Sequence, residues 1–330
     1  MALELGKKFL IIKLGAIGDV VHTTVIATAI KQKYPNSEVH FLTVPSMMSL
    51  LENHPHIDKV LEWNPAYRKS FKYLLKVAFQ GRKEHYDVVF NMTRALRNIA
   101  LSYLMCPRKV IGKQNFGKAW VEEYFLTAKA MMEELELPER LYLSVNDAAR
   151  EKASNFLNSY PSPHYLFFPG GATDKSRQGR IWGLDAWKEL ATKLSIKGGT
   201  VFVSGSSVEA EYHSCLDNAV VLSGQYSLTA SLALMQQVDY VISGDSGPAH
   251  LSAAVGTKTI ALCGSTSPDK IKPFGANGYA ISSPNTCRFC WKKRCKFLKS
   301  SNEIITPCMK AITPEMVYQK IEEINSTLDK

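Results

Sequence analysis

The sequence has no long apolar run: no stretch reaches the about 18 consecutive apolar residues that a membrane-spanning helix needs. Residues 1–8 lack the apolar core of a secretory signal, so we expect a protein that stays in the cytoplasm. Cys and His show no zinc-finger spacing, and there is no RNP-like segment or isolated basic tail, so nucleic acid is not an expected partner. The formal net charge of +10 favours anionic partners, such as an acidic glycolipid or an anionic membrane surface, although solubility alone also explains it.

Two motifs of nucleotide-dependent enzymes are missing as well. Gly15 and Gly18 do not have the Gly-x-Gly-x-x-Gly spacing of dinucleotide-binding proteins, and no acidic residue ends the second predicted strand, which argues against a dehydrogenase. No Asp-x-Asp occurs, although metal-dependent sugar transferases with a single sheet use this motif to hold a divalent ion on a diphosphate. Its absence favours a site in which a helix dipole and side-chain cations replace the metal.

Residues 240–256 form the most informative stretch. Its first three residues favour a buried strand, and Pro248 and Gly256 suit the beginning and the end of a helix. Gly244 and Gly247 allow backbone geometry that a Cβ would forbid, and a serine is placed to cap the helix. A helix start presents free N–H groups and a partial positive charge, which predicts a phosphate or pyrophosphate site. The residues that we assign to this site are Asp245, Ser246, Gly247 and His250.

The same stretch contains Gly-Asp-Ser-Gly-Pro, which resembles the nucleophile segment of trypsin-like proteases. That segment belongs to an all-β double barrel with an upstream His and Asp. Here a predicted helix follows the turn, and strands alternate with helices throughout, so a protease is not expected.

The alternation of short apolar strands and helices predicts an α/β fold with two parallel sheets, each covered on both faces. Residues 158–163 are rich in Pro and Ser and predict a boundary between a domain of residues 1–157 and a domain of residues 158–330. The last helix, residues 314–328, closes the chain and is expected to pack back on the first domain. Ligands of such sheets bind at the carboxyl ends of the strands, here in a cleft between the halves. The predicted strands are residues 9–13, 39–44, 61–63, 87–91, 109–111, 165–168, 200–203, 220–221, 240–242 and 259–262.

Asp19 is the candidate general base. It lies just past the first predicted strand, where a helix begins, and Gly15 and Gly18 let the backbone turn tightly there. An aspartate at this position is equally well explained as a helix N-cap.

Polar side chains also follow strands of the second half. Thr173, Lys175 and Arg180 lie in the loop after residues 165–168, where cations and a hydroxyl would stabilise a leaving diphosphate. Glu209 follows another strand and suits ribose hydroxyls. For each of these residues, a solvated loop position or a helix cap is the alternative.

The first half offers two acceptor features. Arg94, Arg97 and Lys113 follow predicted strand ends and could pair with carboxylate or phosphate groups of an acceptor, with Gly18 beside them. Residues 67–83 combine an apolar helical stripe with six Lys and Arg and no acid. This segment predicts either a helix that meets an anionic membrane surface or an amphipathic helix packed on its own sheet.

The seven cysteines divide into two groups. Three of them, Cys106, Cys215 and Cys263, are expected to be small buried apolar residues. The other four cluster near the end of the chain and predict a structural zinc or iron site, with free thiols or a disulfide as the alternatives. They are Cys287, Cys290, Cys295 and Cys308.

The chain resembles glycosyltransferase family 9, the ADP-heptose:lipopolysaccharide heptosyltransferases. The resemblance covers nearly the full length and rests on residues 13–20 with Thr23 and Thr24, 169–171, 180–182, 205–209, 244–250 and 308–309. It implies a GT-B fold, with two Rossmann-like domains and the nucleotide-sugar donor on the second. It also implies inverting, metal-independent transfer of heptose to the Kdo- or heptose-bearing inner core on lipid A, at the cytoplasmic face of the inner membrane.

The resemblance also implies residue roles: Asp19 as the base, Arg180 as the cation at the donor phosphate, Glu209 as the nucleoside carboxylate, and residues 245–250 as the diphosphate turn. Two other functions stay open at this point. One is a related transferase with another nucleotide-sugar or a protein acceptor. The other is a non-catalytic nucleotide-binding protein of the same fold, against which an intact Asp19 and Arg180 argue.

Overall fold

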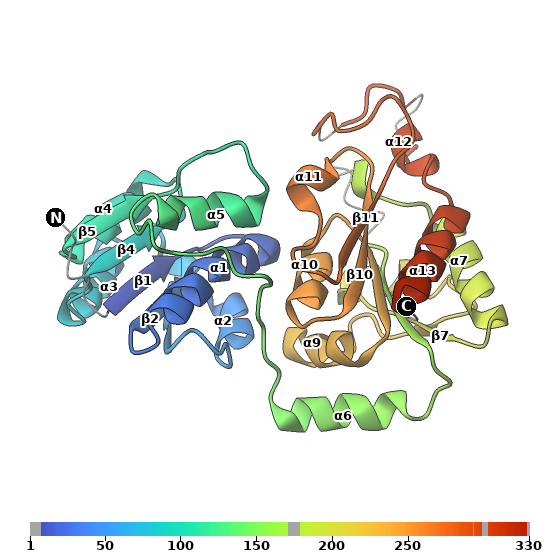
Figure 1. Ribbon diagram of the computed structural model, residues 1–330, viewed down its shortest axis with the longest axis horizontal. Coiled ribbons are helices and arrows are strands. Elements are labelled where there is room, and N and C mark those ends of the chain that lie inside the picture. The colour runs from blue at the N-terminus through green and yellow to red at the C-terminus, as the bar shows by residue number, and fades with distance from the viewer. Residues whose placement is uncertain (1–7, 171–178, 293, 299–302, 329–330) are drawn as a thin grey trace. The chain divides into compact units, whose positions relative to one another are not determined.

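The computed structural model describes residues 8–170, 179–292, 294–298 and 303–328. The chain divides into two compact units, residues 1–144 (unit 1) and 145–330 (unit 2). Each unit is a parallel sheet with helices on both faces, which confirms the predicted α/β class (Figure 1). The sequence placed the boundary after residue 157, but helix α6 (Asp147–Leu157) packs against α9 (Leu228–Gln237) and therefore belongs to unit 2.

The sheet of unit 1 has the strand order β3-β2-β1-β4-β5, with every pair parallel. Its order reverses between β1 and β4, because the chain moves outward from β1 to β3 and then returns to the other side. Such a reversal opens a crevice at the carboxyl ends of the two central strands. The strands are β1 (Lys8–Ile12), β2 (Glu38–Thr43), β3 (Lys59–Glu62), β4 (Val88–Asn91) and β5 (Lys109–Gly112).

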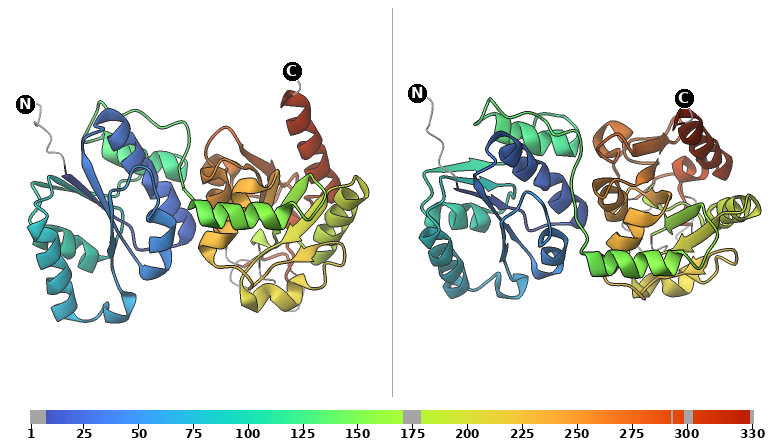
Figure 2. Two further views of the ribbon diagram at one scale, coloured as in Figure 1. Left: turned by 90° about the horizontal axis from the view of Figure 1, so that it is seen from below. Right: turned by 60° about the horizontal axis from the view of Figure 1, so that its bottom comes forward.

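Helices cover the two faces of this sheet in pairs (Figure 2). The pair α1 (Ile17–Lys33) and α5 (Trp120–Lys129) packs together, and so does the pair α3 (Phe71–Lys83) and α4 (Leu96–Leu104). Helix α1 is buried from Val20 to Ile30. The hydroxyls of Thr23 and Thr24 donate back to carbonyl oxygens of the same helix, and that of Thr28 pairs with the His56 Nδ1, which lets these polar residues lie in the core. The short α2 (Pro45–Leu51) and the 3-10 turn η1 (Pro65–Tyr67) complete the unit.

The sheet of unit 2 has the order β11-β10-β9-β6-β7-β8, again with every pair parallel. Its order reverses between β6 and β9, so the loops after these two strands border its crevice. The sequence did not predict β11, which begins with a glycine and has only two buried residues. The strands are β6 (His164–Phe168), β7 (Thr200–Val203), β8 (Val220–Val221), β9 (Tyr240–Gly244), β10 (Lys258–Cys263) and β11 (Gly278–Ser282).

The last helix of the chain, α13 (Pro314–Leu328), packs on α7 (Leu184–Ile196). Its buried residues Val317, Ile321 and Ile324 join the core of unit 2 around Trp182 and Trp187, whereas the sequence led us to expect packing on the first domain. The remaining elements of unit 2 are η3 (Ser207–Glu209), α8 (Ala210–His213), α10 (Gly247–Ala254), α11 (Pro268–Ile271) and α12 (Pro307–Lys310). Within the described ranges, no helix is both long and apolar enough to cross a bilayer.

Candidate active site

Asp19 lies in the first turn of α1, at the carboxyl end of β1. The residue that caps this helix is Ala16, so the alternative interpretation of Asp19 as an N-cap does not hold. The Asp19 carboxylate instead forms an ion pair with Lys13, with Oδ2 3.0 Å from the Lys13 Nζ. The Asp19 side chain is 43% exposed and the Lys13 side chain 10%, so the carboxylate can meet a solute while the ammonium stays beneath it.

Other groups of unit 1 hold the Lys13 ammonium in place. It donates to the Tyr124 hydroxyl of α5 at 2.8 Å and contacts the carbonyl oxygen of Met92 at 3.5 Å. Burial lowers the pKa of Lys13, but the Tyr124 hydroxyl and the Asp19 carboxylate outweigh it and leave that pKa raised. Lys13 is therefore a stable cation beside Asp19 at neutral pH.

Sequence reasoning missed the roles of Lys13 and Tyr124. A signal for Lys13 was present, because a charged residue directly after a fully apolar strand must find a partner when the strand is central. Tyr124 carried no such signal, since it reaches the site only through the packing of α5 on α1.

Three of the predicted acceptor residues lie near this pair. Gly18 is in the first turn of α1 with Asp19. Lys113, just past β5, lies over the rings of Trp120 and Tyr124, with its Nζ 4.9 and 4.5 Å from their centroids. Burial is the main cause that lowers the pKa of Lys113, and the positive charges of Lys13 and Arg94 lower it further. The Asp19 carboxylate acts in the opposite direction. Arg94 is exposed at the end of β4.

Arg97 does something other than the sequence led us to expect. It lies in α4, and its guanidinium donates to the carbonyl oxygen of Ser70, the residue that caps α3. Arg97 therefore fastens α4 to α3, and this contact accounts for its position without an acceptor.

Unit 2 holds a second ion pair, at the carboxyl end of β9. The Arg180 Nε lies 3.1 Å from the Asp245 Oδ2, and the Arg180 Nη1 donates to the Asp245 carbonyl oxygen at 3.2 Å. The Asp245 side chain is 5% exposed and that of Arg180 32%. Asp245 therefore orients Arg180, and a buried carboxylate in this position would repel a diphosphate rather than bind one.

The turn after β9 begins α10 as predicted. Ser246 is the cap residue, but its side chain makes no capping hydrogen bond; its hydroxyl pairs with that of Ser243 at 2.9 Å. Gly244 has no left-handed backbone: a Cβ there would lie 2.9 Å from the Arg180 carbonyl oxygen, so glycine is needed for close approach. Gly256, with φ +95°, follows the end of α10, as predicted.

The other predicted donor residues are dispersed. Gly247 and His250 lie in α10, and His250 is buried. The Glu209 Oε2 accepts from the Ser206 N–H and hydroxyl, both at 2.7 Å, so its capping alternative is the one observed. Thr173 and Lys175 lie outside the described residues.

The four clustered cysteines line one small cavity in unit 2, beside Gly179, Ser265 and Thr306. Burial raises the pKa of the Cys308 thiol, and Cys295 and Cys290 lie close enough to raise it further. All four belong to the described part of the chain, and no three of their sulfur atoms approach within 4.8 Å of one another. Of the other three cysteines, Cys263 is buried as expected, but Cys106 and Cys215 are exposed, so that expectation was wrong for two of them.

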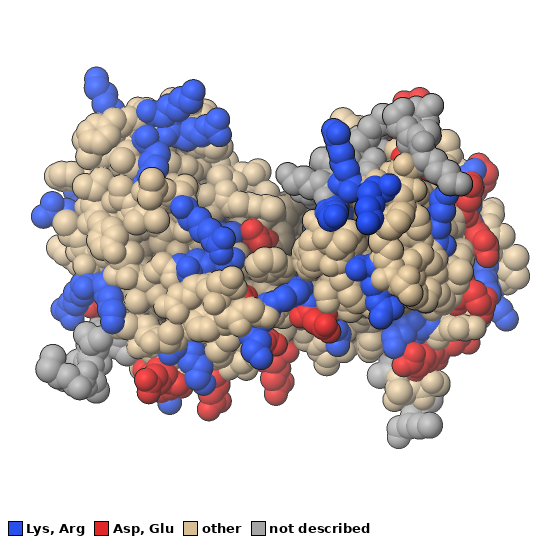
Figure 3. Space-filling view, turned by 90° about the horizontal axis from the view of Figure 1, so that it is seen from above, with Lys and Arg blue, Asp and Glu red and all other residues tan. Residues whose placement is uncertain are grey.

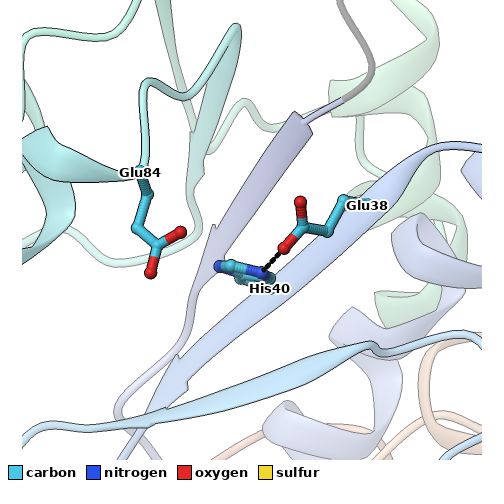
Figure 4. Close-up of side chains that lie close together, drawn as sticks. All are labelled: Glu38, His40 and Glu84. Atoms are coloured by element: carbon cyan, nitrogen blue, oxygen red, sulfur yellow. Dashed lines mark hydrogen bonds and ion pairs between the residues drawn. The ribbon is translucent and has the colours of Figure 1, made fainter.

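Within the described ranges, the potential metal-ligand atoms that lie within 4.8 Å of one another belong to Glu38, His40 and Glu84 (Figure 4). These residues lie at the amino ends of the strands of unit 1, away from Asp19. Lys8 bridges both carboxylates, at 3.1 Å from Glu38 and 2.6 Å from Glu84, and Lys59 pairs with Glu84 at 2.7 Å. The hydrogen bonds from Lys59 and Lys8 lower the pKa of Glu84 to about 2. The cluster is therefore an ion-pair network rather than a metal site.

Comparison with known proteins shows what the whole chain is similar to. The chain matches the lipopolysaccharide core heptosyltransferase OpsX of Haemophilus influenzae at 24% identity over 299 residues, 82% of this chain and 83% of that protein. It matches lipopolysaccharide heptosyltransferase 1 of Pseudomonas aeruginosa at 23% identity over 320 residues, 88% of each.

Two solved structures show the same fold. The ADP-heptose LPS heptosyltransferase II of E. coli has a TM-score of 0.77 at 19% identity, covering 98% of this chain and all of that one. The iron-containing dodecameric glycosyltransferase TibC of enterotoxigenic E. coli has a TM-score of 0.62 at 13% identity, covering 99% of this chain and 78% of that one. The fold is accordingly of the GT-B type.

The model of glycosyltransferase family 9 (heptosyltransferase) matches residues 104–301, which is more than half of the chain. The protein is thus a glycosyltransferase, and it belongs to glycosyltransferase family 9, the heptosyltransferase family.

Proposed function

We propose that this enzyme transfers heptose from ADP-heptose to the Kdo- or heptose-bearing inner core of lipopolysaccharide, with inversion and without a metal ion. The names of the relatives supply the donor and acceptor classes. The observation that carries the proposal is the half-exposed Asp19 carboxylate, fixed by a buried ammonium at the carboxyl end of β1.

The reaction is a single displacement. The acceptor hydroxyl gives its proton to Asp19 and attacks the anomeric carbon of the donor. The new carbon–oxygen bond forms as the bond to the diphosphate breaks, and ADP takes the electron pair. Lys13 is a positioning residue: it holds Oδ2 of Asp19, so that Oδ1 takes the proton.

Unit 2 receives the leaving nucleotide. Arg180, oriented by Asp245, places a guanidinium beside the first turn of α10, whose helix dipole also favours an anion. The backbone at Ser246 and Gly247 and the side chains of Thr173, Lys175 and His250 complete the donor site in this proposal, and Glu209 remains the candidate for the ribose. Arg94 and Lys113, beside Gly18, meet anionic groups of the acceptor.

Because the acceptor in this proposal is built on a lipid, we propose that the enzyme works in the cytoplasm, peripherally at the cytoplasmic face of the inner membrane. The excess of ten positive charges is consistent with such a surface.

We also propose that the four-cysteine cluster holds a structural zinc or iron ion. Four thiolates suit either metal, and the four cysteines line one small cavity. TibC, which shares the fold, is described as iron-containing. Because no three of these four sulfur atoms lie within 4.8 Å of one another, binding has to draw the thiols together, and it would then tie residues 287–295 to α12.

Replacement of the base tests the first half of the mechanism. We expect Asp19→Asn to lower the transfer rate by roughly 10²–10⁴-fold, because the positioned proton acceptor is lost, while ADP binding is unchanged. Radiolabelled sugar transfer and calorimetric titration with ADP measure the two quantities. The exposed Asp147→Asn is the matched control, and a turnover of Asp19→Asn equal to that of this control would remove Asp19 from the mechanism.

The second half is tested at Arg180. Arg180→Ala should weaken ADP binding by about tenfold to a hundredfold, the usual cost of a lost charge-assisted hydrogen bond. Asp245→Asn should weaken binding less, because the guanidinium remains but loses its orientation, and Arg150→Ala, an exposed arginine elsewhere in unit 2, should have no effect. Undiminished ADP affinity in Arg180→Ala contradicts the donor assignment.

Metal analysis tests the cysteine site. Purified protein should carry about one zinc or iron ion per chain, since a single tetrahedral site uses all four thiolates. Cys290→Ser should lower this content strongly, and Cys215→Ser, which removes an exposed thiol outside the cluster, should leave it unchanged. Metal-free protein from metal-replete cells, with all four clustered thiols reactive, would reject the site.

A further inference from the structure

We propose that the outer faces of α3 and α4 together form a surface that docks on an anionic lipid bilayer. We call it the α3–α4 surface; its apolar members are Phe71, Leu75, Phe79, Leu96, Ile99, Tyr103 and Leu104. The inference names the partner of unit 1 and rests on the proposed function, because an acceptor carried by lipid requires the enzyme to work at a bilayer.

Helix α3 has more apolar surface than its packing uses. Its buried side consists of Leu74, Val77, Ala78 and Gly81. A second apolar stripe points to solvent at the helical spacing of four residues: Phe71 and Phe79 are each 65% exposed and Leu75 is 41% exposed. The sequence placed Phe71, Leu74, Leu75, Ala78 and Phe79 in one stripe, and only the structure separates its buried members from its exposed ones.

Helix α4 adds a solvent face that is nearly free of charge. Leu96 is 83% exposed and Tyr103 63%, with Ile99 and Leu104 exposed beside them. The helix contains no acidic residue, and its one basic residue, Arg97, is occupied by the Ser70 carbonyl. Because α4 packs on α3 and Arg97 ties the two together, the exposed apolar residues of both helices belong to one pair of packed helices on unit 1.

The charge around this patch is mostly positive; Glu62 and Glu84 line a cavity beside Lys76 and Lys83. Residues 65–110 contain ten Lys and Arg but only two acids, Glu84 and Asp87. Glu84 pairs with Lys8 and Lys59, and Asp87 pairs with Arg108, so neither neutralises the basic side chains on α3. Figure 3 shows Lys and Arg beside uncharged surface along the upper edge of unit 1. The exposed cations next to the patch are Arg68, Lys69, Lys72, Lys76, Arg82 and Lys83.

Exposed apolar side chains beside exposed cations favour an anionic bilayer as the partner. Aromatic and aliphatic side chains flanked by exposed cations are the features with which a helix lies in the interface of an anionic bilayer. A second copy of the chain would bring the same cations against each other, so self-association through this surface is disfavoured. An exposed apolar patch of this kind in a soluble domain also needs a partner of its own.

Co-sedimentation of the full-length chain with vesicles tests the proposal, without donor or acceptor present. We expect binding to phosphatidylcholine vesicles that contain phosphatidylglycerol, and weak binding to phosphatidylcholine alone. Binding should fall with added salt, because salt screens the attraction of the lysines. Lys72→Gln with Lys76→Gln should weaken it by about fivefold per charge removed, and Phe79→Ser with Leu96→Ser should weaken it at least as much.

Matched controls are available on unit 2. Ile196→Ser removes an apolar group that is 78% exposed, and Lys152→Gln with Lys197→Gln removes two exposed charges; neither variant should change vesicle binding. Transfer to a water-soluble acceptor fragment should be the same in all four variants, which separates this inference from the proposed function. Absence of binding to anionic vesicles at low salt overturns the proposal, and so does an equal loss of vesicle binding in the control variants. A dimer that forms without vesicles and is abolished by Phe79→Ser with Leu96→Ser also overturns it.

Discussion

The candidate site of unit 1 depends on the ion pair between Lys13 and Asp19. An ammonium that is almost fully buried is costly unless partners surround it. Three elements supply them: the first turn of α1 gives the carboxylate, α5 gives the Tyr124 hydroxyl, and the residue after β4 gives a carbonyl oxygen. The packing of α5 on α1 is therefore a requirement of the site as well as of the core. The carboxylate that results is fixed on one side and accessible on the other.

Unit 2 holds a similar ion pair, in which the signs of the buried and the exposed charge are exchanged. There the buried member is the carboxylate of Asp245 and the exposed member is the Arg180 guanidinium. Both pairs lie beside the reversal of strand order in their sheet, next to β1 in unit 1 and β9 in unit 2. In each case a buried charge determines the orientation of an exposed charge of opposite sign. In the proposed function, the exposed carboxylate accepts a proton and the exposed guanidinium binds the leaving diphosphate, the two tasks that sugar transfer from a nucleotide requires.

The sequence predicted most strands, the two-sheet class, and the start and end of α10, because these depend on local patterns. It proposed Asp19 and Arg180 as site residues but not the contacts that hold them: Tyr124 lies far along the chain, and Asp245 was assigned to the diphosphate. It assigned Arg97 to an acceptor because its contact with Ser70 depends on tertiary packing. The exposure of apolar side chains was hardest to predict, because a residue's type does not reveal which face of a helix its neighbours cover. Part of the apolar stripe of α3 is exposed, and Cys106 and Cys215 lie at the surface.

A double-mutant cycle between Lys13 and Asp19, measured on the rate of sugar transfer, tests most directly whether the pair acts as one unit. Lys13→Met, Asp19→Asn and the double variant are compared with the wild type after thermal unfolding has shown that all of them fold. If Lys13 acts only by positioning Asp19, the double variant will be no slower than Asp19→Asn alone. If the two losses multiply, the residues act independently, and the positioning role of Lys13 is contradicted.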